Sequence, residues 1–136
     1  MHKRHKYDLI VLLAFLGFGV CVYLMAFEFL NAAVPCTITH GCNEVLQSRY
    51  ANFLNVPLPI WGIAFYFGVT FSALLANRYA KWKKVLTGLL SVGTLAALVF
   101  LYIQFFVLGK ICQYCLATDL LAVTLLMLDL NIEHQL

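Results

Sequence analysis

Four long apolar stretches constrain the fold of this chain more than any other feature. They run over residues 9–29, 58–76, 85–108 and 111–130. A helix needs about 20 apolar residues to cross the hydrocarbon core of a bilayer, and each stretch is long enough. Hydrophobic residues make up 63% of the chain and charged residues 11%, unlike an average soluble domain. The sequence predicts an all-α integral membrane protein, a four-helix bundle that forms one domain over residues 1–136.

The first stretch follows basic residues, as the apolar core of a cleaved signal peptide does. That core is about 7–15 residues long and is followed by small residues at the cleavage site. Here the apolar run is longer and closes on Glu28, Phe29 and Leu30. We therefore expect a retained helix, in which Gly17 and Gly19 let a neighbouring helix come close.

Lysine and arginine residues are distributed unevenly among the connections. Seven of the nine either precede the first stretch or separate the second from the third: Lys3, Arg4, Lys6, Arg78, Lys81, Lys83 and Lys84. Since cytoplasmic connections are enriched in basic residues, we expect both termini inside the cell, at a bacterial inner (plasma) membrane. The basic residues form two juxtamembrane clusters and no long basic face, so no nucleic-acid partner is expected.

Four of the five cysteines fall on the opposite, exported side in this topology. Cys36 and Cys42 lie in the connection after the first stretch, and Cys112 and Cys115 open the fourth. Cys21 lies near the middle of the first helix. We expect it to be an inert packing thiol, because a thiolate there would be desolvated.

The four exported thiols admit three interpretations. Static disulfides are common outside the cytosol, a four-thiolate zinc site is chemically possible, and two redox pairs would exchange electrons. The position of Cys115 favours the redox interpretation. The free N–H groups and dipole of a helix N-terminus stabilise a thiolate, and a thiol at the membrane edge can meet a lipid-soluble oxidant. We expect no metal in that case.

The connection over residues 30–56 is long enough to have a function of its own. Its segment "CNEVLQSRYANFL" spaces apolar residues at helical intervals, at Val45, Leu46, Tyr50, Phe53 and Leu54. This spacing predicts a short helix that lies on the membrane interface.

Several of these motifs together resemble the vitamin K epoxide reductase family in its bacterial form. The resemblance rests on Cys36 and Cys42 with five residues between them, then Val45, Ser48, Tyr50 and Ala51, then "VPLPIWGIAFY", and finally "CQYC" at the fourth helix. It covers nearly the whole chain. Another class of quinone-linked thiol oxidase also has four helices and four cysteines, but its Cys-x-x-Cys lies in the first exported loop.

The resemblance implies a membrane thiol oxidoreductase that supports disulfide formation. Electrons would pass from a separate, exported thioredoxin-fold partner to a membrane quinone of the ubiquinone, menaquinone or vitamin K type. Cys36 would receive them from the partner, Cys42 would pass them to Cys112, and Cys115 would lie beside the quinone ring. Two alternatives are a reductase of vitamin K quinone or epoxide, and a non-catalytic membrane adaptor held by structural disulfides.

The resemblance also indicates a quinone site that includes Ser48, Leu58, Trp61 and Asp119. Ser48 matches a polar family position that supports thiol exchange, although a local hydrogen bond explains it equally well. Leu58 and Asp119 stand where vertebrate members have an asparagine and a tyrosine near the quinone carbonyls, so we expect the ring to be held differently here. A carboxyl inside a membrane helix faces a cavity or a polar partner. Asp119 is therefore either a proton donor to the reduced quinone or a neutral carboxyl with no part in the chemistry.

Overall fold

The computed structural model describes residues 7–30, 52–53, 56–109 and 113–135. Its elements are α1 (Asp8–Leu30), the short strands β1 (Asn52–Phe53) and β2 (Val56–Pro57), α3 (Leu58–Ala76), α4 (Lys81–Tyr102), the π-helix η2 (Ile103–Leu108) and α5 (Gln113–Gln135). Within the described part, four helical segments are long and apolar enough to cross a membrane. The prediction of a four-helix membrane bundle is confirmed.

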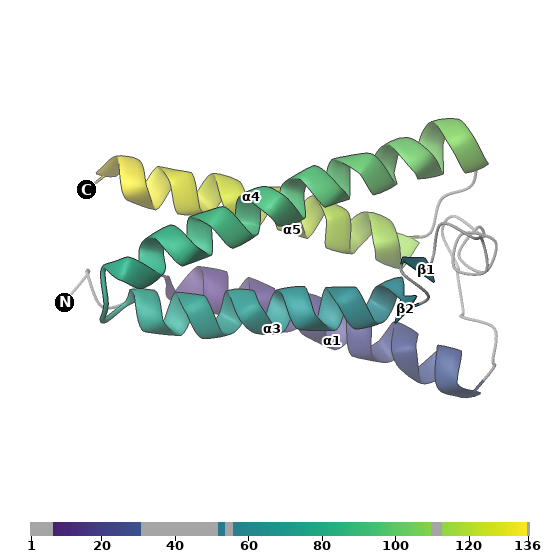
Figure 1. Ribbon diagram of the computed structural model, residues 1–136, viewed down its shortest axis with the longest axis horizontal. Helices are drawn as coiled ribbons and strands as arrows, with labels where there is room; N and C mark the ends of the chain where they lie inside the picture. Colours follow the sequence, from purple (N-terminus) through teal and green to yellow (C-terminus); the bar gives the residue numbers. More distant parts are fainter. Residues whose placement is uncertain (1–6, 31–51, 54–55, 110–112, 136) are drawn as a thin grey trace.

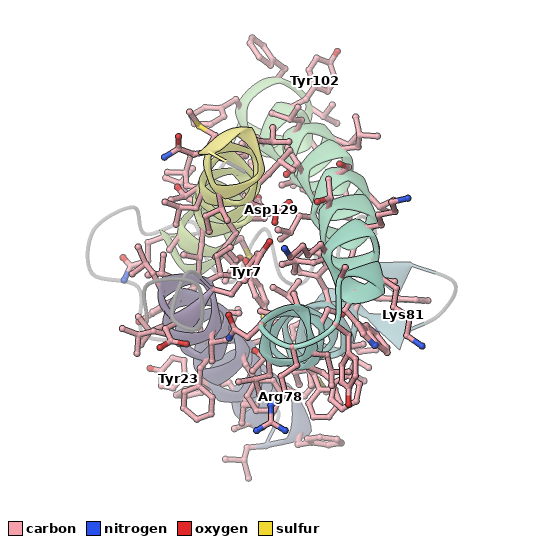
Figure 2. All side chains as sticks on the ribbon, turned by 90° about the vertical axis from the view of Figure 1, so that its left-hand side faces the viewer. Tyr7, Tyr23, Arg78, Lys81, Tyr102 and Asp129 are labelled. Atoms are coloured by element: carbon pink, nitrogen blue, oxygen red, sulfur yellow. The ribbon has the colours of Figure 1, made fainter. Side chains whose placement is uncertain are left out.

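Successive helices run in opposite directions (Figure 1). The start of α1, the connection from α3 to α4 and the end of α5 lie at one end of the bundle, which exposes Arg78 and Lys81 and which we call the basic end. The start of α5 and the β1–β2 pair lie at the other end, which we call the thiol end because Cys115 is there. Viewed from the basic end, α1, α3, α4 and α5 form a ring in which each helix contacts the next (Figure 2).

The helix boundaries lie close to those expected, and α3 matches them at both ends. Its start is fixed by two prolines. Pro57 lacks a backbone N–H and precedes the first helical residue, and Pro59 occupies the first turn, where a missing donor costs no helical hydrogen bond. The third span begins at Lys81, four residues before its apolar run, because lysine is a good helix former and its charge stays at the bundle end.

The last six residues of the third span form the π-helix η2 instead of continuing the α-helix. A π-helix is rare and often occurs at a functional site. It ends at Gly109, which has φ of 65°, a left-handed conformation that L side chains adopt only at a cost. This glycine turns the chain from η2 towards α5.

The interfacial helix expected after Cys42 falls mostly outside the described residues. At its end the expectation is wrong, because Asn52 and Phe53 form β1 and pair antiparallel with β2, with Phe53 opposite Val56. The physical reason is the proline that follows. A residue before proline is held in an extended conformation, so Val56 offers an extended edge with which the preceding residues pair.

The described helices are apolar on nearly every side, as expected for helices between lipid and a protein core. Large side chains such as Phe15, Phe67 and Phe106 project outward. The prediction for Gly17 holds, since a Cβ there would come within 2.6 Å of the Tyr66 ring on α3. The prediction for Gly19 is wrong, because that side of α1 has no neighbour within 4 Å.

One carboxyl is buried near the basic end and was not singled out from the sequence. Asp129 of α5 is 0% exposed, and the Thr87 hydroxyl of α4 lies 2.5 Å from its Oδ2. Figure 2 shows Asp129 and Tyr7 inside the ring of helices. A carboxyl in lipid would be costly, so its place between helices is the expected one. The contact joins α4 to α5 far from the thiol end.

Candidate active site at the thiol end

A cavity of about 510 Å³ lies among all four helices in the thiol half of the bundle. Its walls are mainly aliphatic, aromatic and glycine residues of α3 and α4, completed by the last part of α1, by η2 and by the first turns of α5. The lining residues with a polar or sulfur-containing side chain, or an indole, are Cys21, Trp61, Tyr66, Gln104, Cys115, Thr118 and Asp119. Cavities of this size and character bind small apolar molecules that carry a few polar groups.

Cys115 reaches the cavity from the first turn of α5. Its side chain is half-buried against Leu24 of α1, in a small cluster with Leu108 and Tyr114. The backbone N–H groups of a first helical turn point away from the helix, and with the helix dipole they stabilise a negative charge nearby. Cys115 is thus a cysteine at a helix N-terminus, with its side chain on the wall of the cavity.

Cys21 of α1 also lines the cavity but lies deeper in the bundle. It is a free thiol, 4% exposed, and packs directly on Gly62 of α3, where an added Cβ would come within 2.5 Å of its Sγ. Its role as a packing residue is confirmed. The sequence did not indicate that it faces the same cavity as Cys115.

The hydroxyl groups at the cavity bind backbone carbonyls. Tyr66 donates to the carbonyl oxygen of Thr118, and Thr118 Oγ1 donates to that of Cys115 over 2.9 Å. Gln104 instead donates a hydrogen bond to another side chain. Its Nε2 lies 3.3 Å from Oδ2 of Asp119. These two side chains form a polar pair on a mainly apolar wall.

The cavity opens towards the lipid between α3 and α4. Four of its lining residues are also exposed on the outer surface: Trp61, Ala64, Val92 and Ala96. Figure 1 shows that α3 and α4 diverge from their connection towards the thiol end. A membrane-soluble molecule can therefore reach the cavity without crossing the aqueous phase.

Comparison with known proteins identifies the family. The model of the Vitamin K epoxide reductase family matches residues 8–130. The chain belongs to this family. The match runs from the start of α1 to residue 130 in α5, and it includes Cys112 and Cys115. Membership makes the chain a membrane oxidoreductase, in a family whose members use quinones.

The cavity fits the quinone that the vitamin K epoxide reductase family uses. A quinone ring is flat and apolar with two carbonyl oxygens, and many quinones have a long apolar tail. The apolar walls can contact the ring, and the Gln104–Asp119 pair can contact a carbonyl oxygen. The opening between α3 and α4 leaves room for a tail that extends into lipid.

The structure brings together three of the residues predicted from the sequence, Trp61, Cys115 and Asp119, on the wall of one cavity. Leu58 is the first residue of α3, but its side chain is outside the described part. Ser48, Cys36, Cys42 and Cys112 are outside it as well. The roles assigned to all of these residues stay predictions. Gln104 was missed, although an amide within the apolar run "IQFFVL" is a usable signal.

Proposed function

We propose that this chain is a quinone-dependent thiol oxidase that keeps an exported disulfide-forming protein oxidised. The observation that carries the proposal is the position of Cys115. It lies in the first turn of a membrane helix, on the wall of an apolar cavity that opens to lipid and also contains a carboxyl, Asp119. This arrangement supports transfer of electrons from a thiolate to a membrane-soluble acceptor.

The proposed relay is a sequence of thiol–disulfide exchanges. A partner dithiol attacks the Cys36–Cys42 disulfide at Cys36, and the partner leaves with a disulfide. The Cys42 thiolate then attacks Cys112 and releases Cys115 as a thiolate. Cys36 next attacks Cys42, which restores the outer disulfide and leaves Cys112 and Cys115 reduced.

The last step regenerates the Cys112–Cys115 disulfide. A bound quinone supplies an electron-accepting ring, and the two electrons and two protons of the dithiol convert it to quinol. Cys115 would be the thiolate beside the ring, and the sulfur atoms of Cys112 and Cys115 would join in a disulfide as the ring takes up their two electrons and becomes quinol. Asp119 is placed on the cavity wall, where it can give a proton to a reduced carbonyl oxygen. The apolar walls exclude water from the reacting atoms.

The proposed partner is a soluble, exported protein of the thioredoxin fold, and the proposed location is a bacterial inner membrane. The thiol end would face the exported side and the basic end the cytoplasm. The exposed residues Arg78, Lys81 and Lys84 at one end of the described bundle support this orientation, since basic residues are retained inside.

The purified protein in detergent should oxidise an added dithiol only when a quinone is present, with one quinol formed for each disulfide. Loss of quinone absorbance and titration of free thiols measure the two products. Vitamin K epoxide in place of quinone tests the alternative reductase activity. A protein that leaves every added quinone unreduced would contradict the proposed function, and activity with the epoxide alone would favour the alternative.

Labelling of intact cells tests the orientation. Lys81 should be protected from a membrane-impermeant amine reagent until the membrane is opened, because it lies at the basic end. Cys36, after mild reduction, should react with an impermeant maleimide in unopened cells. The opposite pattern, with Lys81 labelled and Cys36 protected, would invert the proposed topology.

A further inference from the structure

Gln104 is a polar side chain in a part of the bundle where polarity is costly. It is only 2% exposed and lines the cavity. It belongs to η2, the last part of the third membrane-spanning segment. An uncharged polar group at such depth lowers stability unless other groups compensate, and it commonly marks a functional site. Its helix is also irregular, because η2 is a π-helix, and such segments occur often where a protein binds a ligand.

The neighbours of Gln104 indicate which ligand group it fits. Tyr66 and Thr118 donate their hydroxyl hydrogens to backbone carbonyls, so neither hydrogen is left for a ligand in the cavity. The Gln104 amide carries two hydrogens, and its contact with Asp119 uses one N–H as the donor. This contact fixes the amide nitrogen on the cavity side of η2. Gln104 and Cys115 thus line the same cavity.

We propose that Gln104 is a specificity-determining residue that donates a hydrogen bond to a ring carbonyl of the bound quinone. An incoming carbonyl oxygen adds to, or exchanges with, the contacts that the amide already makes. Asp119 holds the amide in place, and the carbonyl bound there is close to the carboxyl proposed to protonate it. The inference rests on the proposed function, because it concerns the ligand of the same cavity.

The selectivity that follows is for a carbonyl-bearing ring over a hydrocarbon of the same shape. A buried carbonyl oxygen left without its hydrogen-bond donor costs enough to change affinity by about tenfold. Removing the amide should therefore weaken binding of menadione, a naphthoquinone without a long tail. It should not weaken binding of 2-methylnaphthalene, which has the same ring system and no carbonyl.

Tryptophan fluorescence measures this binding without turnover. Of the two tryptophans, Trp61 lines the cavity, whereas Trp82 lies in the first turn of α4 at the basic end. Trp82 packs edge-on against Phe71, so Trp82→Phe keeps a ring there and leaves Trp61 as the reporter. In this background, menadione should quench Trp61, and 2-methylnaphthalene should compete with menadione.

Gln104→Leu and Gln104→Met should each raise the dissociation constant of menadione by about tenfold. Neither should change that of 2-methylnaphthalene by more than about twofold. Thr70→Val is the matched control. It also replaces a polar group by an apolar one, but Thr70 bonds to the Tyr66 carbonyl oxygen within α3 and lies away from the cavity, so menadione binding should not change.

Three results would overturn the inference. If the Gln104 variants bind menadione as tightly as the parent, the amide does not contact a carbonyl. If both ligands weaken equally, Gln104 only shapes the cavity. If menadione does not quench Trp61 even with Gln104 present, the cavity is not a quinone site, and the proposed function fails together with the inference. Thermal unfolding verifies folding of each variant.

Discussion

Cys115→Ser should abolish quinone-dependent dithiol oxidation, with a loss of rate on the order of 1,000-fold. A serine hydroxyl is not ionised at the helix N-terminus at neutral pH and cannot form a disulfide, so both steps assigned to Cys115 are lost. The variant should still form a mixed disulfide with a partner protein through Cys36. Quinone reduction at the parental rate would show that another thiol meets the ring.

A second substitution of Cys115, followed by peptide mapping of the disulfides, tests the order of the relay. In Cys115→Ala, Cys112 has no resolving thiol, so it should attack the outer disulfide and accumulate as Cys42–Cys112, releasing Cys36. Finding Cys42 bonded only to Cys36 would contradict that order. Cys21→Ala is the matched control, because it removes the other described thiol of the cavity wall but keeps the relay. It should retain most of the activity.

Gly17→Val should strongly destabilise the packing of α1 on α3. The first added carbon would come within 2.6 Å of the Tyr66 ring, and that ring cannot retreat without breaking its bond to the carbonyl oxygen of Thr118. The variant must separate α1 from α3 or lose the link from α3 to α5. We expect the free energy of unfolding in detergent to fall by about 3 kcal/mol.

Gly19→Val is the control for that experiment, two residues away on the same helix. A Cβ at Gly19 meets nothing within 4 Å, so valine there projects into lipid, and the unfolding energy should change little. Equal destabilisation by the two variants would mean that helix propensity, not contact with Tyr66, is the cause. Tyr66→Leu combined with Gly17→Val should recover part of the loss, because it removes the ring that the valine meets.

The four membrane spans could be predicted from the sequence because transfer of apolar side chains from water depends on local composition. A run of about 20 apolar residues needs no knowledge of its neighbours to be recognised. The place of Cys115 at the start of a membrane helix was also predictable. Cys112, Cys115 and the start of the fourth apolar stretch lie within a few residues of one another, so this placement could be read from a short segment of sequence.

The short pairing of Phe53 with Val56 was not predicted. The apolar spacing of the preceding segment favours a helix, but Pro57 holds the residue before it in an extended conformation. The two glycines of α1 illustrate the same limit. Gly17 and Gly19 are equivalent as sequence, and only the helix that packs beside α1 determines which of them is a close contact.

What the sequence determined by itself is therefore the number and length of the helices, the basic end of the bundle and the residue types available for redox chemistry. Only the tertiary structure placed Cys115, Asp119 and Trp61 on one cavity, added Gln104 and Cys21 to its wall, and opened it between α3 and α4. The physical reason is that helices apolar on all sides carry no mark of which face meets protein and which meets lipid. That choice is made when small residues such as Gly17 and Gly62 let particular helices approach, and the cavity is the space left between them.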